Sequence, residues 1–185
     1  MSGGRTALRD ATAPDHARLD AVFDRFDLAD ARSYGGFLSA HAAALLAVEP
    51  QLDAHGIAAL IPDWPERRRG ELIRADLASL GLEVPAPLAA PELASEAALW
   101  GAAYVVEGSR LGGAVLARHV GPGLPTAYLA AAQPKGAWRA FIAMLDAAVA
   151  DDDRLTEAAA GAHATFALFE AAGLHYLNQL ESCDR

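Results

Sequence analysis

The chain has 185 residues, of which 53% are apolar, so it is long and apolar enough to form a folded domain with a sizeable core. Its 24 acidic and 15 basic residues give a net charge of −9, which argues against nucleic acid or an anionic membrane surface as its main partner. Alanine is abundant and β-branched residues are few, a composition that favours helices over strands.

The first half of the chain shows helical patterns throughout. Apolar residues recur every three or four positions between about 6 and 26, which places them on one face of a helix. A second helix is predicted over 33–48, where it ends before Pro50, and a shorter one can follow over 51–60. Residues 66–80 are predicted to form an amphipathic helix that a glycine ends.

The second half is also predicted to be helical. A loop with three prolines, 82–91, precedes a long helix over 92–120. Two further helices are predicted over 136–150 and 155–180, and no segment of useful length alternates apolar and polar residues as a strand would. We therefore predict an all-α fold, a single domain over 1–185 built as a bundle of seven or eight helices.

The cysteine content and the apolar runs indicate in which cellular compartment the protein is expected. The single cysteine, Cys183, excludes an intramolecular disulfide and suits a reducing compartment. The first residues show no apolar stretch typical of a secretory signal, and charged residues or glycine interrupt every apolar run before it could span a membrane. We expect a cytoplasmic protein without a membrane partner.

His16 is the first candidate for chemistry. It falls on the apolar face of the first predicted helix together with Leu8, Leu19 and Phe23, so we expect its side chain to point inward. Such a residue can be a core histidine that is hydrogen-bonded to a neighbour. It can also be an iron ligand, because neutral imidazole is a common protein ligand for iron. Its position alone leaves both interpretations open.

Three glycines inside the long helix over 92–120 are the second candidate. Each interior glycine costs about 0.8–1 kcal/mol relative to alanine, so the three together cost about 3 kcal/mol. They continue a stripe of small residues, and a kink is expected there. Either another helix packs closely on this stripe, or a flat ligand lies on the bare backbone. The stripe and its neighbours are Gly101, Val105, Gly108, Gly112, Gly113 and Val115.

The other motifs are weaker indications of function. We interpret the basic run 67–69 as the solvated start of a helix. Glu71 and Asp76 lack the spacing of the carboxylate and histidine pairs of di-iron bundles. The sequence contains no HExxH, CxxC or P-loop motif.

Two segments together resemble the haem oxygenase family. Residues 8–16, LRDATAPDH, resemble its opening helix, in which a histidine follows an Ala-Thr pair by four residues. Residues 104–113, YVVEGSRLGG, resemble the distal helix of its bacterial, biliverdin-producing branch. Residues 76–81 and 164–169 also look like bacterial members, in the same order along the chain.

The resemblance implies a haem site between the first helix and a kinked, glycine-rich helix. His16 would be the proximal iron ligand, and haem would serve as both cofactor and substrate. Gly108, Gly112 and Gly113 would lie over the distal haem face, where their missing side chains leave room for dioxygen. Ser109 stands where the animal enzymes have an aspartate, and would be a catalytic residue of the distal side.

The resemblance also implies residues at the haem edge and a set of partners. Arg9 takes the place of a basic residue that pairs with a haem propionate, and its guanidinium can bind both carboxylate oxygens. Phe166 would pack near the haem edge. The reaction implied is the opening of haem to biliverdin, carbon monoxide and ferrous iron, with dioxygen and an electron donor such as a ferredoxin or a reductase. The product could supply iron or a bilin-binding photoreceptor.

Two alternatives are weighed beside this enzyme. One is a haem-binding or regulatory module of the same fold without turnover. The other is a helical-bundle enzyme of the related thiamine-degrading type, which requires a nucleophilic cysteine or a carboxylate cluster inside the bundle. Cys183, close to the end of the chain, is a poor candidate for that nucleophile.

Overall fold

The computed structural model describes residues 4–131 and 133–183, and every regular element within them is an α-helix. The predicted all-α fold is thereby confirmed. Four helices are long: α1 (Gly4–Phe23), α2 (Ala31–Ala54), α6 (Glu96–Leu116) and α8 (Asp152–Cys183). The others are shorter: α3 (Ile57–Leu60), α4 (Trp64–Arg67), α5 (Gly70–Ser79) and α7 (Ala137–Ala148).

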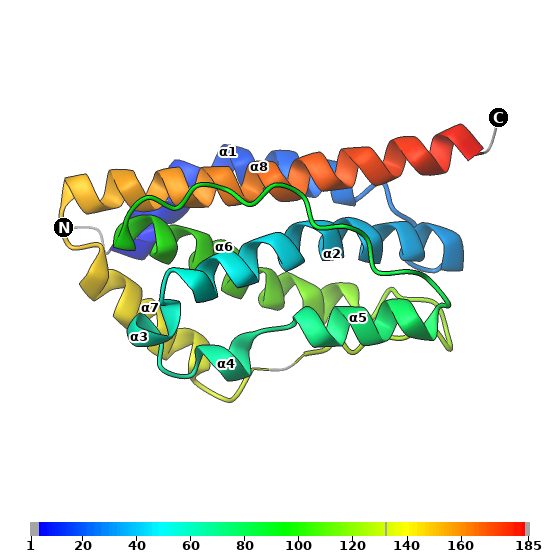
Figure 1. The fold of residues 1–185 in the computed structure, drawn as a ribbon, viewed down its shortest axis with the longest axis horizontal. Helices are drawn as coiled ribbons and strands as arrows, with labels where there is room; N and C mark the ends of the chain where they lie inside the picture. Colours follow the sequence, from blue (N-terminus) through cyan, green and yellow to red (C-terminus); the bar gives the residue numbers. More distant parts are fainter. Residues whose placement is uncertain (1–3, 132, 184–185) are drawn as a thin grey trace.

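The helix α8 organises the bundle. It runs along one edge of the molecule for almost its whole length and packs against α1, α2 and α6 (Figure 1). The short helices α3, α4 and α5 lie on the opposite edge, with α5 packed on α2 (Figure 1). The apolar side chains of the four long helices meet between these edges and form one core.

A close crossing of two helix backbones joins α6 to α8. A Cβ on Gly101 would stand 1.8 Å from the carbonyl oxygen of Ala158, and one on Gly161 would stand 2.2 Å from that of Ala98. No side chain larger than hydrogen fits at either position. These two glycines therefore set how closely α6 approaches α8.

Two helix starts follow from side-chain caps. The carboxylate of Asp30 accepts a hydrogen bond from the amide of Ser33, and the hydroxyl of Ser95 accepts one from the amide of Ala98. The sequence pattern predicted that this helix begins at residue 92. The second cap explains why α6 begins at Glu96 instead. The helix ends at Leu116, four residues before the predicted end.

The prediction that a helix ends before Pro50 was wrong, because α2 continues through this residue to Ala54. Pro50 lies on the exposed side of α2, whereas Val48 and Leu52 on either side of it are buried. The apolar face therefore stays in the core on both sides of the proline, and this packing outweighs the lost backbone hydrogen bond.

The predicted single helix over 66–80 is also corrected. It is split into α4 and α5 by a break at Arg68, whose backbone is extended at φ −64° and ψ 142°. The break has a cause in the side chains, since Arg67 and Arg69 on either side of it both reach buried partners on α6. None of the described helices is long and apolar enough to cross a membrane.

Candidate functional site

His16 lies in the middle of α1 on the exposed side of that helix. Its side chain is 64% exposed, so the expectation that it points into the core was wrong. The buried residues of α1 form a stripe that does not include His16. His16 follows the stripe residue Asp15 by one position, which is a rotation of about 100° around the helix. That stripe comprises Leu8, Thr12, Asp15 and Val22.

The rotation of α1 is fixed by a buried carboxylate next to His16. Asp15 accepts hydrogen bonds from Arg18 Nη2 at 2.6 Å and from His163 Nδ1, on α8, at 2.8 Å. These bonds hold Asp15 against α8. The next residue, His16, is consequently turned toward solvent, where it is free to meet a ligand.

The imidazole of His16 has a second partner that orients it. Its Nδ1 lies 2.9 Å from Asp20 Oδ2, one helical turn further along α1. A carboxylate on one ring nitrogen fixes the tautomer of a metal-binding histidine and raises its basicity. The arrangement leaves Nε2 for a metal. The ring of Phe166, a buried residue of α8, stands edge-on at 6.0 Å between centroids.

The glycine stripe of α6 has two different surroundings. Gly101 is packed tightly on α8, as described above, and Gly113 is packed against the backbone of Leu129, whose carbonyl oxygen would lie 3.1 Å from an added Cβ. At Gly112, none of the described residues outside the adjoining backbone would come within 4 Å of a Cβ. At Gly108 the nearest such atom is a ring carbon of Trp138 at 3.8 Å.

Helix packing therefore explains Gly101 and Gly113 but not Gly108 and Gly112. Gly113, which was expected over the distal haem face, is buried on the packed side of α6, against Leu129. Gly112, in contrast, is exposed.

Large apolar side chains lie beside the two unpacked glycines. Leu111 is 50% exposed and Val115 is 55% exposed. Both are three or four residues from Gly108 or Gly112, so the four residues share one face of α6. An apolar face with bare backbone in its middle is typical of a surface that a flat apolar ligand covers.

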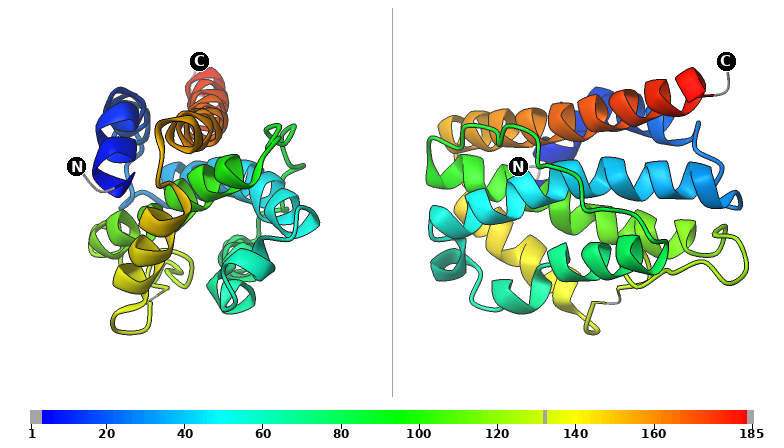
Figure 2. Two further views of the ribbon diagram at one scale, coloured as in Figure 1. Left: turned by 90° about the vertical axis from the view of Figure 1, so that its left-hand side faces the viewer. Right: turned by 45° about the vertical axis from the view of Figure 1, so that its right-hand side comes forward.

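Two helices link α1 to this part of α6. The helix α7 packs against both, and α8 does so as well. The backbone amide of Arg5 donates to Asp146 of α7 at 2.7 Å, and Trp138 of α7 lies near Tyr104 of α6, with 6.4 Å between ring centroids. The end-on view in Figure 2 shows α1 and the far end of α6 on the same side of the bundle.

Charges on α1 also reach α6. Burial raises the pKa of the Tyr104 hydroxyl, and the positive charges of Arg5 and Arg9 oppose that rise. Arg9 is 58% exposed and forms an ion pair with Asp10 at 2.8 Å. It lies seven residues before His16, which puts both side chains on the same exposed face of α1.

Ser109 is turned away from the open glycine face. Its hydroxyl donates to the carbonyl oxygen of Val106 at 2.7 Å and accepts a hydrogen bond from Arg69 Nη2. The structure therefore brings this predicted catalytic residue to a buried network behind α6 and not to the side where Gly112 is exposed.

Glu107 is the centre of that network. It is fully buried and accepts hydrogen bonds from Arg67 Nη1 at 2.6 Å, Gln133 Nε2 at 2.6 Å and Arg110 Nε at 3.2 Å. Burial lowers the pKa of the Arg110 guanidinium, and the nearby charge of Arg69 lowers it further. Arg110 thus belongs to the buried side of α6.

The network overturns our interpretation of the basic run. Arg67 and Arg69 are 5% and 1% exposed, whereas Arg68 between them is exposed and pairs with Asp53 at 2.9 Å. A solvated helix start is therefore correct for Arg68 alone. The sequence contained one signal for this arrangement, the acid Glu107 beside the glycines, but its partner Arg67 lies 40 positions away.

Within residues 4–131 and 133–183, no three histidine, cysteine, aspartate or glutamate side chains gather as ligands of a metal ion. The carboxylate cluster that a di-iron bundle requires is absent from this part of the chain. A single histidine ligand is the arrangement that a haem iron accepts.

Comparisons with known proteins identify relatives. No family model matches the chain. A protein named heme oxygenase from Xanthomonas campestris pv. campestris (strain 8004) is 40% identical over 147 residues, which cover 76% of this chain and 88% of that protein. Heme oxygenase PigA from Pseudomonas aeruginosa is 30% identical over 171 residues, 85% of each chain.

A solved structure agrees in fold. The NO- and CO-bound heme oxygenase from Neisseria meningitidis superposes with a TM-score of 0.81 over 96% of this chain and 94% of its own, at 23% sequence identity. The architecture of the two proteins is therefore the same.

Proposed function

The chain belongs to the haem oxygenase family, and on this premise we propose that it opens haem to biliverdin, carbon monoxide and ferrous iron with dioxygen and an external electron donor. One observation supports this proposal above the others. Gly108 and Gly112 lie on an apolar face of α6 where a Cβ fits: at Gly108 it would meet a ring carbon of Trp138 at 3.8 Å, and at Gly112 it would meet none of the described residues within 4 Å. Helix packing does not account for them, but a flat ligand does.

His16 is the proposed iron ligand. Its Nδ1 is held by Asp20, and its exposed side chain presents Nε2 to a ligand. A histidine of this kind needs only a carboxylate that keeps it in one tautomer and one orientation, and Asp20 provides it. The contact with Phe166 supports the proposal that this aromatic ring borders the haem edge.

The open face of α6 is the proposed distal wall. Bound haem would supply both the iron that activates dioxygen and the porphyrin ring that is oxidised. The protein has to bind and orient this ring and to leave space above it. Leu111 and Val115 offer apolar contacts to the ring, and the bare backbone at Gly108 and Gly112 leaves the space.

Further features of the reaction are proposed with it. Arg9 would pair with a propionate at the same exposed face of α1. Electrons would come from a ferredoxin or a reductase in the cytoplasm, and biliverdin would be available to a bilin-binding photoreceptor. Ser109, whose hydroxyl bonds to Val106 and Arg69, would act on the distal side through the backbone of α6.

The proposal is tested by an absorption titration with haemin, followed by reductant in air. We expect a Soret band typical of a histidine ligand that gives way to a bilin spectrum. His16→Ala should remove the histidine-ligated spectrum and the bilin product. His119→Ala, which changes another exposed histidine, is the control and should behave as the unchanged protein.

The outcomes separate the alternatives. A stable Soret band without bilin would favour a haem-binding module and contradict the enzymatic proposal. A normal histidine-ligated spectrum in His16→Ala would show that another residue binds the iron.

A further inference from the structure

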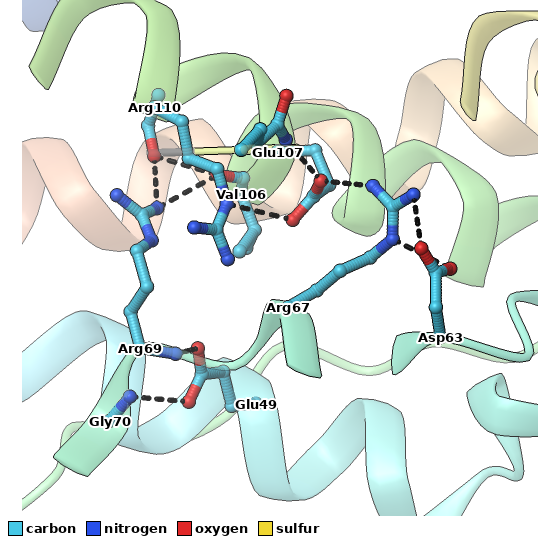
Figure 3. A network of polar contacts seen from close by, with 10 residues as sticks. Glu49, Asp63, Arg67, Arg69, Gly70, Val106, Glu107 and Arg110 are labelled. Atoms are coloured by element: carbon cyan, nitrogen blue, oxygen red, sulfur yellow. Dashed lines mark hydrogen bonds and ion pairs between the residues drawn. The ribbon is translucent and has the colours of Figure 1, made fainter. Parts of the chain in front are cut away.

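The short segment between α4 and α5 holds the turn of α6 that carries Gly108. Arg67 binds Glu107, directly before this glycine (Figure 3). Arg69 binds Ser109, directly after it. Because the chain is extended at Arg68, successive side chains point to opposite sides. Both arginines that flank Arg68 therefore reach α6.

The charged guanidinium of Arg69 is hydrogen-bonded to neutral groups of α6. Its side chain is buried, and the hydrogen bonds of its guanidinium go to the carbonyl oxygen of Val106 at 2.9 Å and to the hydroxyl of Ser109. Both acceptors are neutral, and its Nε has no hydrogen-bond partner among the described residues. Burying a charged group without a directly bound carboxylate is unfavourable. The charge of Glu49 offsets part of this cost, but its carboxylate binds the backbone amide of Arg69 and not the guanidinium. An arginine therefore remains a costly choice if the contact only joins α5 to α6.

Other contacts hold the guanidinium in place. The backbone amides of Arg69 and Gly70 donate to the two carboxylate oxygens of Glu49, at 2.7 and 3.0 Å. The guanidinium carbon lies 4.8 Å from the ring centroid of Tyr128. Backbone and side chain are thus both fixed, so that Arg69 presents its donors to α6 in one orientation.

The bonds converge on one carbonyl of α6. Val106 accepts from Arg69 Nη2 and from Ser109 Oγ, in addition to the amide that a helix provides. Side-chain donors at a helix carbonyl compete with the backbone bond and bend the helix locally. Gly108 lies within this same turn, and its missing side chain makes the turn easy to deform. Arg69 is therefore placed where it can influence the path of the backbone at Gly108.

We propose that Arg69 is a positioning residue for the distal side: through Val106 and Ser109 it fixes the backbone of α6 at Gly108 and so sets how the glycine face meets the haem. This inference rests on the proposed function of the glycine face. It assigns Ser109 an indirect role, as the hydroxyl that links Arg69 to the backbone of α6.

The first test needs no haem. We would measure hydrogen–deuterium exchange of the apo protein with Arg69→Met, with Arg69→Lys, which keeps a charged donor, and with Arg68→Met as the control. Arg69→Met should speed exchange of amides 106–113 by about tenfold or more relative to amides 160–172 of α8. Arg69→Lys should restore most of the protection, and Arg68→Met should resemble the unchanged protein.

The second test uses haem turnover. Arg69→Met should change the proportions of the biliverdin isomers, because a displaced glycine face exposes different edges of the ring. Ser109→Ala should change them in the same direction but less. If Arg69 acts through Ser109, adding Ser109→Ala to Arg69→Met should change little more.

The outcomes are distinct. Equal acceleration of exchange in α6 and α8, or unchanged isomer proportions in Arg69→Met, would overturn the inference and leave a purely structural contact. If Arg69→Met fails to fold, the exchange and isomer data of Arg69→Lys and Ser109→Ala decide instead, and unchanged values in Ser109→Ala count against the proposal. If the unchanged protein forms no bilin, the proposed function fails, whereas the exchange result on α6 stands by itself.

Discussion

At the scale of single residues, a substitution of Arg9 tests the proposed contact with a haem propionate. Arg9 lies two helical turns before His16, about 10 Å along α1, a distance compatible with a propionate at one end and iron at the other. Its present partner, Asp10, is exposed and competes for the same guanidinium. Because an exposed ion pair contributes little, Arg9→Glu should weaken haemin binding by about two- to fivefold, or alter the biliverdin isomer.

The measurement is a haemin titration followed by chromatography of the product. Arg25→Glu is the matched control, since Arg25 is 46% exposed, is also ion-paired and makes the same change of charge. Affinity and isomer that are equal to those of the unchanged protein would remove Arg9 from the site.

His16 shows what can and cannot be predicted from the sequence for a single residue. The segment and the candidate ligand could be identified from the sequence, but the direction of the side chain could not. Asp15 is the charged residue of the buried stripe, where His163 and Arg18 bind it. His163 lies 148 positions away, so no local pattern of apolar residues predicts that an aspartate faces the core here.

At the scale of the element, two glycines of α6 should respond in opposite ways to the same methyl group. Gly101→Ala places a Cβ 1.8 Å from the carbonyl oxygen of Ala158, so the α6–α8 crossing must shift. We expect a loss of at least about 2 kcal/mol in the free energy of unfolding. Gly112→Ala meets open space and gains helix propensity, so apo stability should stay equal or rise by up to about 1 kcal/mol.

The rate of haem turnover should rank the two variants in the opposite order to their stability. Gly112→Ala should form biliverdin more slowly, because the methyl group fills space above the ring that dioxygen needs. Gly101→Ala should turn over normally per folded molecule. Urea unfolding of the apo proteins and single-turnover bilin formation give the two readings. A Gly112→Ala protein with lowered stability and normal turnover would restore the packing explanation for this glycine.

The presence of helices was predictable where local periodicity decides it, whereas their ends were predicted only to within a few residues. The last helix, predicted over 155–180, is present as α8 (Asp152–Cys183), and the helix predicted over 136–150 is present as α7 (Ala137–Ala148). The break between α4 and α5 was not predictable, because residues 66–80 have a good helical pattern. Partners on α6 decide it, since Arg67 and Arg69 can both reach α6 only from an extended backbone.

At the scale of the molecule, the proposed haem site depends on the whole bundle and not on any one helix. The helices α1 and α6 both pack against α8, and α7 packs against both of them. The sequence predicted the class of fold because helical periodicity is a local property. The relative placement of α1 and α6 depends on contacts such as Gly101 with Ala158 and Asp15 with His163, which pair distant positions.

One residue at the centre of the bundle should make its stability depend on pH. His41 of α2 is enclosed by the rings of Phe23, Phe37 and Phe169, with centroids 4.4–5.6 Å away, and its Nδ1 lies 2.9 Å from the hydroxyl of Tyr128. Burial lowers the pKa of His41 to about 3, and the charge of Arg69 contributes to this shift. The folded protein therefore keeps His41 neutral at every pH near neutrality.

This depressed pKa predicts an acid-dependent loss of stability. An unfolded histidine binds a proton near pH 6.5, so His41 contributes its full stability above that pH and loses it as the pH falls toward about 3, by at most about 5 kcal/mol. His41→Gln cannot bind that proton but can still bond to Tyr128, so its free energy of unfolding should fall less between pH 7 and pH 4. Urea unfolding of both proteins across this range measures the difference in slope. Glu49, whose pKa burial raises, acts with the opposite sign but is common to both proteins. Equal slopes would mean that His41 is protonated in the folded bundle, and that the aromatic enclosure does not exclude its charge.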